Sequence, residues 1–495
     1  MPMGESCPPM RSSTPIPYAV FAQRVRQYRR SDVLRVCAQM GAEGEQVTRG
    51  FASRRPGLAN YVQPFSIAGV ARTALAACNE YRTAHCGRRE VEQLCGWYVN
   101  VDEPDDGTEP GTNHLRQMLA RLAYEQFPHQ LAGMETVGRS IALFEDRFQG
   151  IAGAPTPDEW RAAFGASVAD LVLAGFVAYA SACVNGGRVL IDQIGEPELD
   201  ALYEGLTARE GQKVLESFFC ADLQEVAQRA RELERAGREK WSPSPLAARP
   251  VVRLASNELV VPWPHLVVER FSPSGLFYAG IEFFGDSFGR ALGQIFELYV
   301  GDQLRLLPDA VVTGEQVYLD RGSEHKTCDW FVVTDACVVL VEVKATRPVH
   351  DVRTGSPDGL TDIERKVGRA ASQLERTARL VRADHPAVGF VPKDRPLLGL
   401  VVTLEPFYLL DTWLYDDVVG GRELPVTVAS SHEFEAVVAG LLAADDVGPR
   451  LIAGLTADGA TPSRLLRSIE GVDDPPSNPI LSKAWDRILP TKRKS

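Results

Sequence analysis

Two charged residues stand inside an apolar segment late in the chain. In DACVVLVEVKA, residues 335–345, Glu342 and Lys344 lie two apart among valine residues. The run of β-branched residues predicts a buried strand, and residues two apart on a strand share one face. Charges on a buried face are costly unless other groups compensate them. This acid and this amine therefore mark a candidate site of chemistry.

The preceding strand supplies a second acid. It begins at Asp329 in DWFVVT, and a two-residue turn at 335–336 would place Asp329 directly opposite Glu342. Opposed carboxylates are unfavourable by themselves, but a divalent cation between them reverses the sign of the interaction. Mg²⁺ commonly takes one or two carboxylates together with waters and substrate phosphate. We therefore predict that Asp329 and Glu342 bind Mg²⁺ and that Lys344 contacts a metal-bound water or a phosphate oxygen during attack on a phosphodiester.

The spacing Glu-x-Lys has little specificity on its own. The chain contains it at 324–326, 342–344 and 364–366. Only the middle copy sits in an apolar strand with an acid at the matching position of the hairpin. The alternative interpretation is an edge hairpin whose charges reach solvent.

A helix before the hairpin is predicted to add a further acid. In FGRALGQIFELYV the apolar residues recur at helical spacing, and Gly289, Gly293 and Glu297 share another face. Small residues on that face would allow a close approach to a sheet, which would bring Glu297 near the two carboxylates. The alternative is an exposed glutamate beside two tolerated glycines.

A helix after the hairpin is predicted at about 361–383, where apolar residues form a regular stripe. Lys366 and Gln373 lie along the edge of this stripe. We expect Gln373 to hydrogen-bond a water or a phosphate, and Lys366 to contact nucleic acid. A solvated amide is the alternative for Gln373.

The segments FELYV, CDWFVV, VEVKA and SQLERT, in this order and spacing, resemble the PD-(D/E)xK nuclease superfamily, which has the restriction-endonuclease-like fold. The resemblance covers about residues 283–404, and Cys328 stands where that family often has proline. It implies a Mg²⁺ cofactor, with Mn²⁺ as a substitute. The roles that it implies are metal ligation by Asp329 and Glu342, positioning or activation of the attacking water by Lys344, support of the metal site by Glu297, and a match to the family's helical glutamine by Gln373.

The order of predicted elements defines the fold class as α/β, or α+β overall. A mostly helical N-terminal domain precedes a restriction-endonuclease-like αβββαβ core, in which helices flank a mixed sheet. The core is predicted as a helix at 283–306, strands at 312–319, 328–334 and 337–345, a helix at 361–383 and a strand at 397–404. The predicted domains are 1–240 (helical, for recognition or regulation), 241–282 (linker and short strands), 283–404 (nuclease-like core) and 405–495 (a mixed extension).

The amino-acid composition argues against a strongly basic protein, a disulfide-rich protein and a membrane protein. The 495 residues are 45% hydrophobic and 24% charged, with a formal net charge of −12, which argues against a protein coated in basic surface. The nine cysteines form no C-x-x-C pair, so reduced core thiols are favoured over disulfides or zinc. The first residues lack the apolar run of a signal peptide, and the longest uncharged stretch is short and mixed for a membrane span. We expect a cytoplasmic protein with no membrane contact.

Basic residues in the N-terminal half provide a second candidate contact with nucleic acid. The segment FAQRVRQYRRSDVLR includes Arg29 and Arg30, which could contact phosphates; a solvated helix face is the alternative. The dipeptide Gly-Lys never occurs, so there is no P-loop. If cleavage needs ATP-driven translocation, a partner ATPase must supply it, and double-strand cutting by a single site usually calls for a homodimer.

These observations predict a Mg²⁺-dependent endonuclease that hydrolyses DNA by metal-activated water. Bacterial restriction or phage defence is the context that the family resemblance suggests. Two alternatives remain open. One is an RNA-directed nuclease, or an effector that a signal activates through the helical domain. The other is a nucleic-acid-binding scaffold on an inactive nuclease fold.

Overall fold

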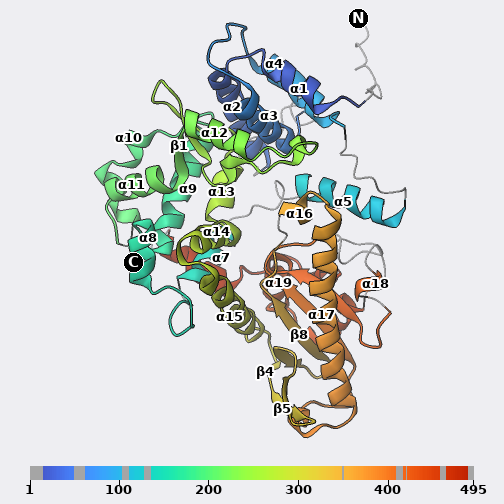
Figure 1. The fold of residues 1–495 in the computed structure, drawn as a ribbon. Coiled ribbons are helices and arrows are strands. Elements are labelled where there is room, and N and C mark those ends of the chain that lie inside the picture. The colour runs from blue at the N-terminus through green and yellow to red at the C-terminus, as the bar shows by residue number, and fades with distance from the viewer. Residues whose placement is uncertain are drawn as a thin grey trace, which may run out of the picture. The chain divides into compact units, whose positions relative to one another are not determined.

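The computed structural model (Figure 1) divides into two compact units, each described separately below. Unit 1 comprises the described residues within Met1–Thr108, Ala174–Pro197 and Ala208–Arg270, and unit 2 those within Glu109–Leu173, Glu198–Thr207 and Phe271–Ser495. The residues that the structure describes are 15–48, 62–102, 111–126, 135–145, 147–203, 205–347, 350–408, 416–419, 421–456 and 464–488.

Unit 1 is mostly helical, as predicted for the N-terminal half. Its small sheet has the order β1-β2-β3, with β1 and β2 parallel and β2 and β3 antiparallel. Helices α9 (Val168–Val184) and α13 (His265–Phe271) contain residues of both units. The other elements are α1 (Tyr18–Val25), α2 (Arg30–Thr48), α3 (Pro64–Ala77), α4 (Arg88–Val99), α10 (Ile191–Ile194), α11 (Ala208–Phe219), β1 (Cys220–Asp222), α12 (Leu223–Glu232), β2 (Val251–Arg253) and β3 (Leu259–Val260).

Cysteine side chains in unit 1 serve its core. Burial raises the pKa of Cys78, Cys86 and Cys95 to about 12, which keeps these thiols protonated and unreactive at neutral pH. The eight cysteines that the structure describes are all free. Seven of these eight are buried and Cys183 is half-buried, so the predicted place of the thiols in the core holds for seven of them, and their reduced state stays a prediction.

The boundary between domains was predicted at a different place. Residues 241–282 were predicted to form a linker with short strands, and two short strands are present there: Val251–Arg253 pairs with β1, and Leu259–Val260 pairs with Val251–Arg253, both inside unit 1. Unit 2 in turn takes in residues from the N-terminal half, among them those of α7 (Glu135–Phe144). Sequence composition indicates turn-rich connectors, whereas compact units depend on contacts between segments that are distant in the chain. The two compact units therefore do not divide at the predicted boundary near residue 240.

Unit 2 is built on a five-stranded mixed sheet with the order β10-β9-β8-β7-β4. β4, β7 and β8 are antiparallel neighbours, whereas β8, β9 and β10 are parallel. The sheet strands are β4 (Val311–Gly314), β7 (Trp330–Val333), β8 (Val338–Lys344), β9 (Leu397–Thr403) and β10 (Val426–Ser430), and a separate hairpin consists of β5 (Val317–Asp320) and β6 (Ser323–Lys326).

The predicted order of helix, three strands, helix and strand is present in unit 2, because α15, β4, β7, β8, α17 and β9 follow one another around the separate hairpin. β6 and β10 were not predicted. The helices of unit 2 outside α9 and α13 are α5 (Thr112–Gln126), α7, α8 (Pro157–Phe164), α14 (Pro273–Phe284), α15 (Asp286–Leu304), α16 (His350–Arg353), α17 (Pro357–Arg382), α18 (Asp416–Val419), α19 (Ser431–Leu441), α20 (Val447–Leu455) and α21 (Pro479–Ile488).

Helix α17 covers the face of the sheet that carries Leu340 and Glu342, and it lies along the strands in Figure 1. It begins at a strong local signal, since the Ser356 side chain accepts a hydrogen bond from Gly359 N and Pro357 occupies the first turn. Its apolar residues Ile363, Val367, Ala370 and Leu374 are buried, which confirms the predicted stripe. The helix therefore stands directly over the strand that carries the candidate site.

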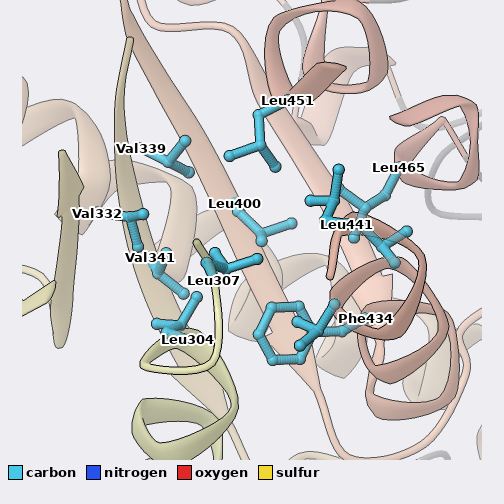
Figure 2. Close-up of a pocket in the computed structure, with 12 residues that line it drawn as sticks. Leu304, Leu307, Val332, Val339, Val341, Leu400, Phe434, Leu441, Leu451 and Leu465 are labelled. Atoms are coloured by element: carbon cyan, nitrogen blue, oxygen red, sulfur yellow. The ribbon is translucent and has the colours of Figure 1, made fainter. Parts of the chain in front are cut away.

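The opposite face of the sheet is mostly apolar. Figure 2 shows Val339, Val341 and Leu400 from the strands facing Phe434 and Leu441 of α19. The cavity between them has a volume of only about 20 Å³ and is lined by apolar side chains alone. A cavity of this kind offers no polar group to hold a water or a ligand. It is a small packing defect, so functional chemistry must be sought on the α17 side.

Within the described part of the chain, one stretch, Pro157–Val184, is both long enough and apolar enough to cross a membrane. However, 67% of its most apolar window is buried inside the protein. Such burial is typical of a core helix and is consistent with a soluble protein. A cytoplasmic location stays a prediction.

Candidate active site

The hairpin of β7 and β8 has the register that the sequence predicts. Trp330 pairs with Val341, and at the turn Thr334 N donates to Cys337 O at 2.9 Å. One step beyond the paired residues, this register places Asp329 opposite Glu342. The two acids therefore meet where the hairpin opens.

Glu342 is a buried acid with only one of its oxygens satisfied. Its residue exposure is 0%, and Oε1 lies 2.5 Å from Lys344 Nζ. Oε2 is buried and has no hydrogen-bond partner among the residues that the structure describes. Burial, followed by the charge of Asp329, outweighs the nearby ammonium and raises the pKa of Glu342 to about 8. An additional cation would satisfy both the charge and the unpartnered oxygen.

Asp329 is held in place by the neighbouring backbone. Its Oδ2 accepts a hydrogen bond from Val343 N at 2.6 Å, which ties the side chain to the strand between Glu342 and Lys344. Burial raises the pKa of Asp329, and this effect exceeds the opposite effects of the Val343 N–H and of Lys344. Asp329 is half-buried, so its carboxylate stands at the border between core and solvent.

Helix α17 fixes the segment that precedes Asp329. Gln373 Nε2 donates to Thr327 O at 3.0 Å, and Cys328 N donates to Thr377 Oγ1 at 2.8 Å. Gln373 was expected to bind a water or a phosphate. In the structure one N–H of its amide donates to the backbone, because the carbonyl of a buried residue needs a donor; a contact with water or phosphate stays a prediction. The observed contact of Gln373 is thus one that positions the acid.

Glu297 reaches the same site from α15. Burial, followed by the charge of Asp329, raises the pKa of Glu297 to about 7. The backbone around it is anchored, since Trp330 Nε1 donates to Glu297 O at 3.1 Å. Five residues that the sequence predicts to act together, listed from N- to C-terminus, therefore contribute to one region: Glu297, Asp329, Glu342, Lys344 and Gln373.

The glycines predicted to bring α15 to the sheet are not those that do so. A Cβ on Gly293 would have no atom within 4 Å, and one on Gly289 would meet side chains of α14 at 3.5 Å. The close approach occurs at Gly301, where a Cβ would lie 2.2 Å from the Trp330 ring. Gly301 leaves room for Trp330, the residue next to Asp329, and this could not be read from helical spacing alone.

A second ion pair at the rim was not predicted from the sequence. Lys326 Nζ of β6 lies 2.7 Å from Glu315 Oε1. Lys326 lowers and Glu315 raises the pKa of Glu297, although both effects are smaller than that of burial. The only sequence signal was the Glu-x-Lys spacing at 324–326, in which Lys326 sits on a polar strand without the apolar alternation that identifies strands.

The predicted nucleic-acid contacts differ in their surroundings. Arg30 is buried in unit 1, and its guanidinium donates to the carbonyls of Ala74 and Cys78 at the end of α3. Carbonyls at the end of a helix lack some of their helical partners, so Arg30 caps the helix and the expectation of a phosphate contact is not supported. Arg29 is half-buried. Lys366 is half-exposed and pairs with Asp362 at 2.6 Å.

The donor set fits a hard divalent cation. No group of three or more His, Cys, Asp and Glu side chains within the described ranges is placed to hold a metal by itself. Mg²⁺ requires fewer protein ligands than that, because it usually keeps several waters and uses one or two carboxylates with substrate phosphate. The unpartnered Oε2 of Glu342, with the Asp329 carboxylate opposite, provides the two oxygen donors.

The fold and the site together define an α/β protein with a buried acidic cluster and one lysine at the open end of a β-hairpin. No family model matches the chain, and the searches of curated proteins and of solved structures also gave no match. Geometry and electrostatics therefore carry the functional argument.

Proposed function

We propose that this protein is a Mg²⁺-dependent endonuclease that hydrolyses DNA phosphodiester bonds. The observation that carries the proposal is Glu342, a fully buried acid with one unpartnered oxygen, set opposite Asp329 and in contact with Lys344. A cluster of acids with raised pKa values is costly for folding. Clusters of this kind are concentrated at functional sites.

The arrangement of the sheet supports the finer assignment of the fold. The restriction-endonuclease-like core is a mixed sheet in which a hairpin carries the acids and a helix crosses to a parallel strand. In unit 2 the hairpin is β7–β8, the crossing helix is α17, and β9 is the parallel strand. We propose that unit 2 contains this core.

Each side chain of the site has a distinct role in the proposed reaction. Asp329 and Glu342 would hold Mg²⁺, which when bound polarises the phosphate and lowers the pKa of a bound water. Lys344, 2.5 Å from Glu342, places its ammonium where negative charge develops on the phosphate or on the attacking water. Glu297, whose pKa burial raises to about 7, can hold or release a proton near neutral pH.

Cleavage of plasmid DNA tests the proposal. The protein is incubated with plasmid in Mg²⁺, in Mn²⁺ or in EDTA, beside Glu342→Ala and Lys344→Ala. We expect metal-dependent cleavage that both substitutions abolish while the fold, followed by circular dichroism, is retained. The matched controls are Glu324→Gln, an exposed acid in another Glu-x-Lys segment, and Lys393→Ala, an exposed lysine. Unchanged cleavage in Glu342→Ala and Lys344→Ala would place the chemistry elsewhere.

The same assay separates the alternatives. Cleavage of RNA in preference to plasmid would favour the RNA-directed nuclease, and binding without cleavage in either metal would favour the scaffold. A role in restriction or phage defence rests on analogy with the fold. A homodimer or a partner ATPase would show as a dependence of double-strand cutting on protein concentration or on added ATP and partner.

A further inference from the structure

Helix α17 carries a row of exposed arginines on the side turned away from the sheet. Arg365, Arg369, Arg376 and Arg379 are all exposed. Their spacing places them within an arc of about 80° on one face of the helix, because each residue advances about 100°. Their Cα atoms extend over about 21 Å at a rise of 1.5 Å per residue. These four residues are called the arginine row.

Three members of the arginine row are unpaired. Arg369, Arg376 and Arg379 make no ion pair or side-chain hydrogen bond with any residue that the structure describes, whereas Arg365 lies 2.5 Å from Asp362. A neighbouring arginine on another face of the helix behaves differently, since Arg382 contacts Glu423 at 2.8 Å. Among the residues that the structure describes, Arg369, Arg376 and Arg379 thus lack the counter-ions that Arg365 and Arg382 have on the same helix.

The arrangement is unfavourable for the helix by itself. Arg365 and Arg369 are four residues apart, and Arg376 and Arg379 are three apart. Like charges at these spacings are neighbours on the helix surface and destabilise it. The chain has a net charge of −12, so acidic residues outnumber basic ones, and yet within the described residues only Arg365 of the row has an acidic partner. A polyanion bound along the helix would remove the repulsion.

The row adjoins the site through Gln373. Arg369 is four residues before Gln373 and Arg376 is three residues after it, so both are its neighbours on the helix surface. Gln373 itself contacts the segment that leads to Asp329. The row itself lies on the opposite side of α17 from the buried stripe, so a duplex bound to it reaches the carboxylates by extending past the edge of the helix that carries Gln373.

We propose that the arginine row binds successive phosphates of duplex DNA and so orients the substrate at the acidic cluster. The inference rests on the proposed nuclease function and assigns its binding surface. Guanidinium groups suit phosphate because they donate paired hydrogen bonds. Contacts to phosphate fix position without reading sequence. The row adds to the contacts predicted from the sequence, Lys366, Arg29 and Arg30, of which Arg30 is used inside unit 1.

Binding is tested without cleavage by fluorescence anisotropy of a labelled DNA duplex in EDTA over a series of salt concentrations. The test variant is Arg369→Ala/Arg376→Ala, and the matched control is Arg161→Ala/Lys483→Ala, which removes two exposed charges from other helices of unit 2. We expect the test variant to bind about tenfold or more weakly and its salt slope to fall by about 1.8, at about 0.9 per lost phosphate contact. The control should match the unmodified protein.

The outcomes separate the two proposals. Equal affinity and salt slope in the test variant and the control would overturn the proposed role of the arginine row. The absence of DNA binding by the unmodified protein would overturn it as well. Tighter binding to an RNA duplex that also depends on the row would overturn DNA as the ligand. Binding that depends on the row without Mg²⁺-dependent cleavage would support the row and overturn the nuclease. Cleavage abolished by Glu342→Gln, with binding independent of the row, would overturn the row alone.

Discussion

Unit 2 contains two buried glutamates with opposite degrees of satisfaction. Glu435 of α19 receives hydrogen bonds from Arg139 Nε at 2.7 Å and from Tyr299 Oη at 2.5 Å, and its second oxygen contacts Arg139 Nη2. Glu342 of β8 has one contact, with Lys344, and a buried oxygen without a partner. Both oxygens of Glu435 are therefore hydrogen-bonded, whereas Glu342 keeps one oxygen that could bind a cation.

The comparison shows how a structural acid differs from an acid suited to chemistry. Every oxygen of Glu435 is paired, and the network continues through Tyr299 to Gln303 and Asn478. Such a network rigidifies the unit when it is complete. Burial and the charge of Asp329 disfavour the ionised form of Glu342 and outweigh the effect of Lys344, so a proton or an added cation would lower the cost of burying it. We therefore expect function at the buried acid whose hydrogen-bonding groups are not all paired, which is Glu342.

The largest expected difference between the two acids lies in activity. Glu342→Gln keeps the size of the side chain but removes the charge that would hold Mg²⁺. We expect the cleavage rate to fall by at least about 1000-fold, the upper scale for loss of one group that stabilises transition-state charge. Glu435→Gln should retain the rate per folded molecule. Single-turnover cleavage, normalised to the folded fraction, measures both, and equal losses would remove the distinction.

Stability should show the reverse order. Glu435→Gln leaves the Arg139 guanidinium, whose side chain is 8% exposed, without its counter-ion, and breaking a buried pair in this way costs about 3–5 kcal/mol. The free energy of unfolding is measured in urea. The double variant Arg139→Met/Glu435→Leu should recover part of the loss, because it leaves no lone charge. A loss below about 1 kcal/mol in Glu435→Gln would show that the pair is not the buried network described here.

The next largest effect that we expect is a change, caused by Glu342, in how the free energy of unfolding depends on pH. Burial raises its pKa to about 8 from an ordinary value of 4.5, so the folded protein binds a proton more tightly than the unfolded chain. This contribution is complete below about pH 4.5 and is lost as the pH rises through about 8. In EDTA, we expect Glu342→Gln to be more stable than the unmodified protein at pH 8.5 by at least about 1 kcal/mol.

The two proteins should have nearly the same stability at pH 5, where Glu342 is protonated and resembles glutamine. Urea unfolding at both pH values checks this, and Mg²⁺ should stabilise the unmodified protein at pH 8.5 because a cation binds the ionised carboxylates. A difference that does not change between pH 5 and pH 8.5 would mean that Glu342 does not titrate in this range.

Sequence reasoning was most successful where the interactions are local. The alternation in 335–345 and the count back through the turn fixed the register that brings Asp329 to Glu342. The charge network of Glu435 could not be predicted in the same way, because Arg139 lies 296 residues away in the chain. β10 was missed for a similar reason: it is recognised by pairing with β9 rather than by a pattern of its own.

Gln373 shows the limit within the site itself. Its position on the edge of α17 was predicted, but its partner, the Thr327 carbonyl, is 46 residues away, and no spacing rule connects the two. The spacing of apolar residues along the helix predicts where Gln373 lies, but it does not predict which group Gln373 contacts. The same applies to Gly301, whose importance depends on the ring of Trp330.

The smallest expected effect follows from this contact. Gln373→Ala removes one hydrogen bond to the segment before Asp329, and we expect a loss of about 0.5–1.5 kcal/mol in the free energy of unfolding with about tenfold slower cleavage. Gln373→Glu should be worse than Gln373→Ala, because a carboxylate cannot donate to Thr327 O and adds negative charge beside three acids. A direct role on substrate phosphate would instead make Gln373→Ala weaken DNA binding in EDTA without lowering stability, so measuring both separates positioning from contact.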